Sequence, residues 1–241
     1  MKVIALIPAR YAATRFPGKL MAMLGTKTVI QHTYDAVYNT KLFDDVIVVT
    51  DSTIIFDSIT TTGGKALMSK QVHESGSDRI AEAASTLHAD IIVNVQGDTP
   101  FAKKEPLAKL LQIFSDTAEE KVQVASLMQA LTNTQDIADP NFVKVAVDKH
   151  FNALFFSRSI IPYPRNTNIS IPYYEHIGVY AFRKQALLQF TQWPTTPLED
   201  AEKIECLRYL ENGIPIKMVL TDYMGVEIDT PEDLQKAEKL L

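Results

Sequence analysis

The strongest constraint on the fold is an alternation of short apolar runs with helical patterns along the first hundred residues. The runs that predict strands are "VIALIPA" (3–9), "DVIVVTD" (45–51), "KALMSK" (65–70) and "DIIVNVQGD" (90–98). Between them, residues 28–40 and 77–87 repeat apolar side chains at helical spacing. Nearly continuous apolar strands are typical of a parallel sheet covered on both faces. The pattern predicts an α/β fold with a doubly wound, mainly parallel sheet.

The second half of the chain has a different pattern. Residues 141–148 and 152–159 predict a hairpin, and a proline-containing, turn-prone stretch follows over 159–175. We then expect a strand over 174–182 and helices over 183–192 and 197–212. Near the end, Thr230 is a candidate N-cap with Pro231 at the first helical position. We interpret this half as an α+β excursion that lids or extends the sheet, within one domain over 1–241.

Composition excludes several classes of protein. The 241 residues are 46% hydrophobic with a net charge of −5, whereas a protein that coats nucleic acid needs a broad basic surface. No run approaches the roughly 18 apolar residues of a membrane span. A single cysteine, Cys206, excludes an intrachain disulfide and a cysteine-cluster metal site. We expect a cytoplasmic protein with neither nucleic-acid nor membrane partners.

The loop after the first predicted strand is unusually basic. Residues 1–34 hold five Lys or Arg and no Asp or Glu, and three of these cations, Arg10, Arg15 and Lys19, lie in "IPARYAATRFPGK". A Pro-Gly turn before Lys19 brings backbone close to a bound group, and the three cations suit a phosphate. The spacing is not that of a Walker loop. An anion site is one interpretation, and a solvated basic loop is the other.

Two aspartates are candidates for a metal site. Asp98 directly follows a predicted buried strand, and Asp229 precedes the C-terminal helix. Ligands of open α/β sheets bind at the carboxyl ends of strands, and carboxylates there suit Mg²⁺ between protein and phosphate oxygens. The competing interpretations are that Asp98 caps a turn and that Asp229 belongs to a helix start. The stretch "HESGSDR" (73–79) has the same ambiguity between a helix cap and a polar ligand site.

Seven motifs together resemble one enzyme family. They are "IPARYAATRFPGK", "HESGSDR", "NVQGDTPF", "FSRSIIPYPR", "HIGVYAFR", "PLEDAEKIECLRYLENG" and "IDTPEDL". Their order and spacing resemble the 3-deoxy-manno-octulosonate cytidylyltransferase (CMP-Kdo synthetase) family over residues 3–238. The resemblance implies a nucleotidyltransferase that couples CTP and Kdo with Mg²⁺, giving CMP-Kdo and pyrophosphate for lipopolysaccharide biosynthesis. It also implies a cytoplasmic homodimer.

The resemblance implies roles for individual residues in binding CTP and the metal. Arg10, Arg15 and Lys19 would hold the triphosphate, and charge on the departing pyrophosphate would be stabilised there. Asp98 and Asp229 would bind the metal, which would lower the pKa of the anomeric hydroxyl. The catalytic set is thus Arg10, Lys19, Asp98 and Asp229. The residues expected to border the cytidine are Ala9, Thr50, Ser75 and Gly76.

The resemblance also implies a sugar-binding set. Gln96 would hydrogen bond the substrates, and Kdo would meet Arg158, His176, Tyr180 and Glu205. Arg158 suits the carboxylate because its guanidinium binds both oxygens. Two of these residues also fit a structural role, because Tyr180 suits a core position and Glu205 a solvated helix position. The implied division of the chain is a nucleotide-binding half (1–131), a sugar-binding and dimerisation excursion (132–222), and a closing strand and helix (223–241).

Three positions depart from the family pattern. Thr99 stands where the family usually has Glu, Cys206 where Gln is usual, and Leu20 where Pro is usual. None removes a proposed metal ligand or phosphate cation. Changes at Thr99 and Cys206 leave the sugar open between Kdo and 8-amino-Kdo, with Kdo preferred.

Three further functions compete with this interpretation. One is a cytidylyltransferase for a nonulosonic acid, which would share the nucleotide end of the chain. Another is a catalytically silent homologue that binds a nucleotide, against which the presence of Asp98, Asp229, Arg10 and Lys19 counts. The third is a glycosyltransferase, which the lack of a D-x-D motif disfavours.

Overall fold

The computed structural model describes residues 1–12, 16–71, 73, 75–115, 122–222 and 226–241. The first half supplies β1 (Val3–Ala9), the 3-10 helix η1 (Lys19–Met21), β2 (Met23–Leu24), β3 (Lys27–Thr28), α1 (Val29–Asn39), β4 (Asp45–Thr50), α2 (Thr53–Thr60), β5 (Ala66–Met68), α3 (Gly76–Thr86), β6 (Ile91–Asn94), α4 (Lys104–Gln112) and β7 (Val124–Leu131). The remainder supplies α5 (Thr134–Ala138), β8 (Lys144–Val147), β9 (Ala153–Ser157), β10 (Tyr173–Arg183), α6 (Lys184–Phe190), α7 (Pro197–Glu202), α8 (Leu207–Glu211), β11 (Ile216–Leu220) and α9 (Pro231–Glu238).

The main sheet has the strand order β11-β7-β10-β6-β1-β4-β5. Strand β10 is antiparallel to both of its neighbours, β6 and β7, while the other pairs along this order are parallel. The hairpin β8/β9 joins through a short pairing of β8 with β10. The mainly parallel sheet confirms the fold class, and the hairpin is the predicted extension of the sheet.

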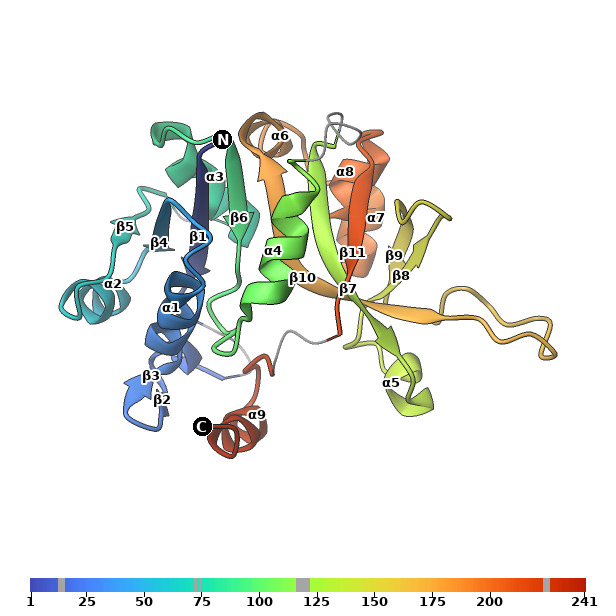
Figure 1. Cartoon of the computed structure of the whole chain (residues 1–241), viewed down its shortest axis with the longest axis horizontal. Coiled ribbons are helices and arrows are strands. Elements are labelled where there is room, and N and C mark those ends of the chain that lie inside the picture. Colours follow the sequence, from blue (N-terminus) through green and yellow to red (C-terminus); the bar gives the residue numbers. More distant parts are fainter. Residues whose placement is uncertain (13–15, 72, 74, 116–121, 223–225) are drawn as a thin grey trace.

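Helices cover both faces of the sheet (Figure 1). In β1, Val3, Ala5 and Ile7 pack in one cluster with side chains of α1, α2 and α4, whereas Ile4 and Leu6 pack in a second with α3, α6 and α8. Because successive side chains of a strand point to opposite faces, a strand buried on both faces is apolar at every position. This two-sided burial explains the continuous apolar runs of the sequence.

The structure confirms some predicted elements of the second half and differs from others. The strand predicted over 174–182 is β10, and it lies inside the sheet between β6 and β7 (Figure 1). The helix predicted over 197–212 is two short helices, α7 and α8, because Lys203 takes a left-handed conformation with φ of 53°. Strands β7 and β11 and helices α2, α4 and α5 were not predicted from the sequence. In the closing segment the structure gives α9, and residues 226–230 form no strand. The division at residues 131 and 222 stays a prediction.

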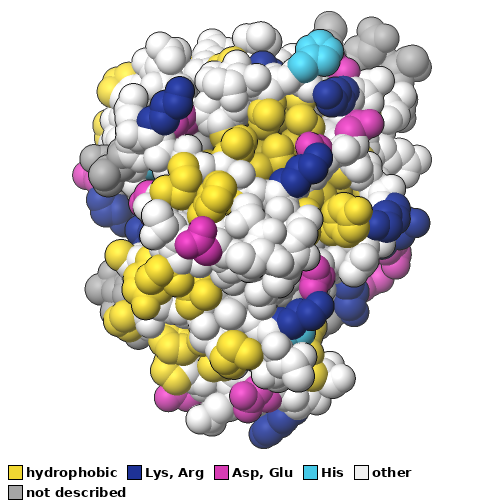
Figure 2. All heavy atoms as spheres, turned by 90° about the vertical axis from the view of Figure 1, so that its left-hand side faces the viewer, with side chains coloured by type: hydrophobic (Ala, Val, Ile, Leu, Met, Phe, Trp, Pro, Cys, Tyr) yellow, Lys and Arg dark blue, Asp and Glu magenta, His cyan; other side chains and the backbone are white. Residues whose placement is uncertain are grey.

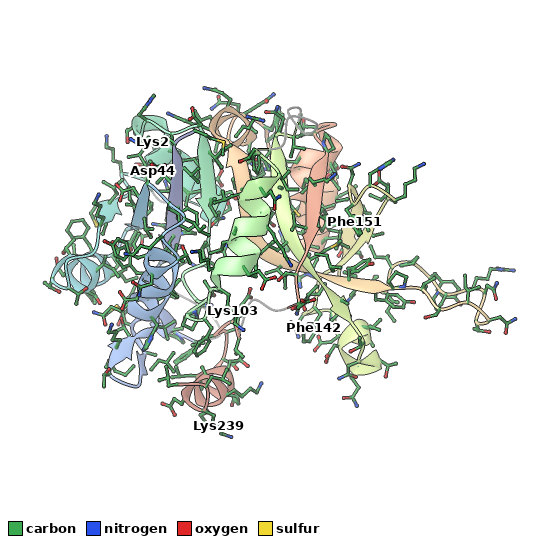
Figure 3. All side chains as sticks on the ribbon, in the orientation of Figure 1. Lys2, Asp44, Lys103, Phe142, Phe151 and Lys239 are labelled. Atoms are coloured by element: carbon green, nitrogen blue, oxygen red, sulfur yellow. The ribbon has the colours of Figure 1, made fainter. Side chains whose placement is uncertain are left out.

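The sheet has two opposite ends along the direction of its strands, here called edges, and different segments lie at each (Figure 3). Lys2 and Asp44 lie at the edge where β1 begins, and Asp44 accepts a hydrogen bond from the Val3 N–H. Lys103, just before α4, lies at the opposite edge, toward α9. The parallel strands end at this second edge, where ligands of α/β proteins bind.

The face that includes α2 and β5 is mixed in character. Figure 2 shows hydrophobic side chains in several groups there, with basic and acidic side chains between them. Exposed Ile54 and Met68 belong to these elements. No helix in the described part of the chain is long and apolar enough to span a bilayer.

Candidate active site

A cavity of about 340 Å³ opens at the carboxyl ends of β1 and β6. Eight predicted site residues line it, namely Ala9, Arg10, Lys19, Ser75, Gly76, Gln96, Asp98 and Asp229. Six further residues were not predicted, namely Pro8, Phe16, Leu20, His73, Arg79 and Gly97. The cavity therefore gathers residues from four separate motifs of the sequence.

Lys19 binds both predicted metal-site aspartates. Its Nζ lies 2.5 Å from Asp98 Oδ2 and 2.7 Å from Asp229 Oδ1. Gly18 precedes it with φ of 70°, a conformation that favours glycine and starts η1. Burial alone would lower the pKa of Lys19, but the two carboxylates outweigh burial and raise it. Lys19 of the basic loop is thus paired with carboxylates that lie far away in the sequence.

The two aspartates fit a hard divalent cation. Their oxygens converge on a single positive atom, the Lys19 ammonium nitrogen, so they also converge on the place where a cation would bind. Mg²⁺ is typically held by one or two carboxylates together with substrate phosphates and water. Among the described residues no group of three or more metal-ligating side chains occurs. The two aspartates therefore suit a cation that is bound by two protein carboxylates and completed by phosphate oxygens.

Glu227 is a third carboxylate of this region that sequence reasoning missed. Burial of its carboxyl group raises its pKa to about 8, and repulsion from Asp98 and Asp229 adds to that effect. The residue as a whole is nonetheless exposed to solvent. Only its position two residues before Asp229 could have drawn attention to it, because alternation along extended backbone places residues i and i+2 on one side.

The start of α3 forms another wall of the cavity. Ser75 is the N-cap, and its hydroxyl accepts a hydrogen bond from the Asp78 N–H. One turn into the helix, Arg79 is buried and donates to Ser69 Oγ at 2.9 Å and to Asp51 Oδ2 at 2.7 Å. The sequence held a signal for Arg79, since a helix brings residues four apart onto one face and Ser75 was already a candidate.

A second cavity of about 820 Å³ adjoins the first. Ser75, Gly76 and Gln96 line both cavities, and Glu205 lines the second. Glu205 lies in the link between α7 and α8, where its Oε1 accepts a hydrogen bond from Ser77 Oγ at 2.8 Å. Burial raises the pKa of this carboxyl group. The helix break at Lys203 therefore turns Glu205 toward the start of α3, and the solvated helix position is not what the structure shows.

Four predicted residues line neither cavity. Thr50 is fully buried at the end of β4. Arg158 donates to the backbone carbonyls of Pro140 at 2.9 Å and Glu202 at 2.8 Å. His176 and Tyr180 lie in β10, where His176 is partly buried and Tyr180 is buried. Arg15 falls outside the described residues. The binding roles of these five residues stay predictions.

His176, which is partly buried, and Tyr180, which is buried, belong to one row of aromatic side chains. The His176 ring meets Phe156 edge to face and lies 5.3 Å from the Tyr180 ring, and its Nε2 lies 3.1 Å from Ser126 Oγ. Burial lowers the pKa of His176 to about 3, so the imidazole is neutral at pH 7. Burial, with smaller effects of Cys206 and Glu205, raises the pKa of Tyr180. Tyr180 is a core residue, which is the structural role that its sequence position also suited.

Comparison with known proteins gives consistent matches over the whole chain. A Cytidylyltransferase family model matches residues 4–219. The 3-deoxy-manno-octulosonate cytidylyltransferase of Flavobacterium johnsoniae is 58% identical over 241 residues, covering 100% of this chain and 99% of the relative. The protein of the same name from Christiangramia forsetii is 56% identical over 240 residues, covering 100% of this chain and 97% of the relative.

Solved structures agree with these relatives. The structure of CMP:2-keto-3-deoxy-manno-octonic acid synthetase complexed with CTP matches with a TM-score of 0.94 and 38% identity, covering 100% of this chain and 98% of that one. The 4-diphosphocytidyl-2C-methyl-D-erythritol synthase of Anaerococcus prevotii, at 18% identity and a TM-score of 0.64 over 99% and 97% of the two chains, shares the fold. The chain belongs to the cytidylyltransferase family and, within it, to the 3-deoxy-manno-octulosonate cytidylyltransferases, a group of nucleotidyltransferases.

Proposed function

We propose that this chain transfers CMP from CTP to the anomeric hydroxyl of 3-deoxy-manno-octulosonate, giving CMP-Kdo and pyrophosphate. The observation that carries the proposal is the convergence of Asp98 and Asp229 on Lys19 inside a cavity that Arg10 also lines. A triphosphate needs cationic side chains and metal-binding carboxylates at one place, and this cavity provides both. Membership of the family supports the same reaction.

At the nucleotide end, the residues of the chain bind and orient CTP. Arg10 and Lys19 neutralise the triphosphate, and their charge favours the departing pyrophosphate, on which negative charge grows. Ser75 and Gly76, at the start of α3, line the cavity and supply polar contacts for the nucleotide in this proposal. Ala9 at the end of β1 borders the cytidine. Arg79, fixed by Asp51 and Ser69, gives this wall a rigid cationic side chain.

Asp98 and Asp229 hold Mg²⁺ in this proposal. When bound, the ion supplies a Lewis acid that polarises the phosphate and makes the anomeric hydroxyl more acidic. The two aspartates would orient the ion, and Lys19 would then donate to phosphate oxygens in place of the two carboxylates. A cavity that holds both reactants in one geometry lowers the entropic part of the barrier.

The acceptor sugar occupies the second cavity in this proposal. Gln96 lines both cavities, so it is placed to contact both substrates, and Glu205 offers a carboxylate to sugar hydroxyls. Arg158, His176 and Tyr180 stay in the proposed sugar-binding set although they do not line this cavity. A carboxylate in the sugar cavity also suits an ammonium group, so 8-amino-Kdo is the second candidate acceptor.

In the cell, the proposed setting is the cytoplasm and the supply of activated Kdo for lipopolysaccharide. We also propose a homodimer. The segment before β10 extends away from the body of the molecule (Figure 1) and exposes Ile160, Tyr163 and Ile169, at 41%, 82% and 58% of their surfaces. An exposed apolar segment of this kind is typical of a protein interface.

The test of the proposed function is product formation by the purified chain. CTP, Mg²⁺ and either Kdo or 8-amino-Kdo are incubated in parallel, and CMP-sugar and pyrophosphate are measured. We expect both products with Kdo, at a higher rate than with 8-amino-Kdo. A faster reaction with the amino sugar would reassign the acceptor. Bound CTP with no product from either sugar would support a silent nucleotide-binding homologue instead.

A further inference from the structure

Among the described residues, three buried side-chain polar atoms have no hydrogen-bond partner. They are the amide oxygen and nitrogen of Asn94 and the hydroxyl oxygen of Thr99. Both residues belong to one six-residue segment, which also carries Gln96 and Asp98. Buried polar groups without partners are rare, and each one costs free energy. Their confinement to the segment that lines the active-site cavities points to a role in the reaction.

Asn94 lies in an apolar part of the second core cluster. It is fully buried at the end of β6, and its neighbours Val93 and Val95 pack in the first cluster on the other face. The strand register places Asn94 between Leu6 of β1 and Tyr180 of β10, both of which belong to the second cluster. A leucine would fill this position at a lower cost of burial than an amide.

Gln96 is the polar residue nearest to Asn94 along the same face of the chain. Its Nε2 donates to the Gly178 carbonyl at 3.3 Å, which is long for a hydrogen bond. Its Oε1 lies at the start of α3, 3.7 Å from where a Cβ on Gly76 would be. Same-face residues of a strand are about 7 Å apart, and two carboxamide side chains can close that separation with one hydrogen bond. Gln96 therefore has a weak partner now and a stronger one within reach.

We propose that Asn94 is a positioning residue for the acceptor sugar. When the acceptor fills the second cavity, the Asn94 carboxamide hydrogen bonds the Gln96 carboxamide and fixes the orientation in which Gln96 contacts the sugar. This inference rests on the proposed function, because the acceptor is the sugar named there. The proposed role explains why the Asn94 carboxamide, which has no hydrogen-bond partner here, lies among apolar side chains.

The first test is Asn94→Leu, which keeps the shape and removes the polar atoms. Replacing a buried unpaired amide by an apolar group of the same shape is neutral or stabilising, so Tm should stay unchanged or rise. The KM for the acceptor should rise, or kcat fall, by about tenfold, as for one lost hydrogen bond, with the KM for CTP unchanged. The comparison variant is Asn212→Leu, at an exposed asparagine with a partner, which should lose stability because the Asn212 amide donates to the Arg208 carbonyl at 2.8 Å.

The second test is a double-mutant cycle with Gln96→Met. If Asn94 acts through Gln96, Asn94→Leu has no further effect on the acceptor kinetics in the Gln96→Met background. Additive effects would overturn the proposal, and so would a loss of Tm in Asn94→Leu as large as in Asn212→Leu. The rate of the wild-type chain in the same assay tests the proposed function by itself, and the melting temperatures test Asn94 without it.

Discussion

Lys19 holds together two carboxylates that would otherwise repel each other. Asp98 and Asp229 are 131 positions apart in the chain, and both reach the same ammonium group. The two aspartates could be suspected from the sequence, because Asp98 follows a predicted strand and Asp229 precedes the predicted C-terminal helix. The ion pairs themselves could not be predicted, since they depend on how distant segments meet. Glu227 was also missed, although its position two residues before Asp229 was a local signal.

At the level of single residues, His176 makes stability depend on pH. Its pKa is about 3 in the folded chain and about 6.5 in an unfolded one. As the pH falls below about 6.5, the unfolded chain takes up a proton that the folded chain does not, so the free energy of unfolding decreases until about pH 3. We expect the melting temperature of His176→Phe to fall less than that of the wild type when the pH is lowered from 7 to 4.5.

The phenylalanine replacement is suited to this site. The His176 ring already packs against Phe156 and Tyr180, and Ser126 Oγ keeps other partners, the carbonyls of Ile177 and Val179. The exposed His150→Gln serves as control and should follow the wild-type curve. Parallel curves of Tm against pH for His176→Phe and the wild type would contradict the account.

The pair α7 and α8 shows where helical periodicity misleads. Residues 197–212 contain no glycine or proline between Pro197 and the end of the pattern, so a single helix was predicted. The break comes from Lys203, a residue type that rarely takes a left-handed conformation. What holds the two helices together is tertiary: the buried Arg208 guanidinium donates to both carboxylate oxygens of Glu199, at 2.8 and 2.5 Å. Local propensity cannot report such a contact.

Breaking this buried ion pair should be costly. Arg208→Met leaves the Glu199 carboxylate without its partner, and we expect unfolding in urea to show a loss of about 3–5 kcal/mol. The double variant Glu199→Met/Arg208→Met should recover much of that loss, because no charge is left buried. Lys236→Met, which removes an exposed ion pair with Asp233, should change stability by less than about 1 kcal/mol. A single variant as stable as the wild type would contradict this role of the pair.

For the whole molecule, the sequence predicted the doubly wound half but not the strand order. Strands β1, β4 and β5 lie side by side in chain order, and the chain then crosses back to place β6 on the other side of β1. Their runs are mostly apolar. Strand β10 lies antiparallel between β6 and β7. It begins at Tyr173, 79 positions after Asn94, the last residue of β6. Pairing over such a separation leaves no periodic signal in the sequence. This arrangement also brings β10 next to the segment of Gln96.

The proposed homodimer is tested on the same scale. We expect sedimentation equilibrium to give about twice the 26.9 kDa of one chain. Tyr163→Asp adds a charge to a side chain that is 82% exposed, so it should weaken the dimer without unfolding the chain. Ile54→Asp, on α2, is the control and should leave the mass unchanged. A wild-type chain that sediments as a monomer at micromolar concentration would contradict the proposal.

The most direct measurement is pyrophosphate release from CTP by Asp98→Asn compared with the wild type, with Kdo and Mg²⁺ present. The substitution keeps the size of the side chain and removes one of the two carboxylates proposed to hold the metal. We predict a rate at least about a hundredfold lower, with CTP still bound, because metal stabilisation of the transition state is worth several kcal/mol. Release at the wild-type rate would contradict the assignment of this cavity as the site of CMP transfer.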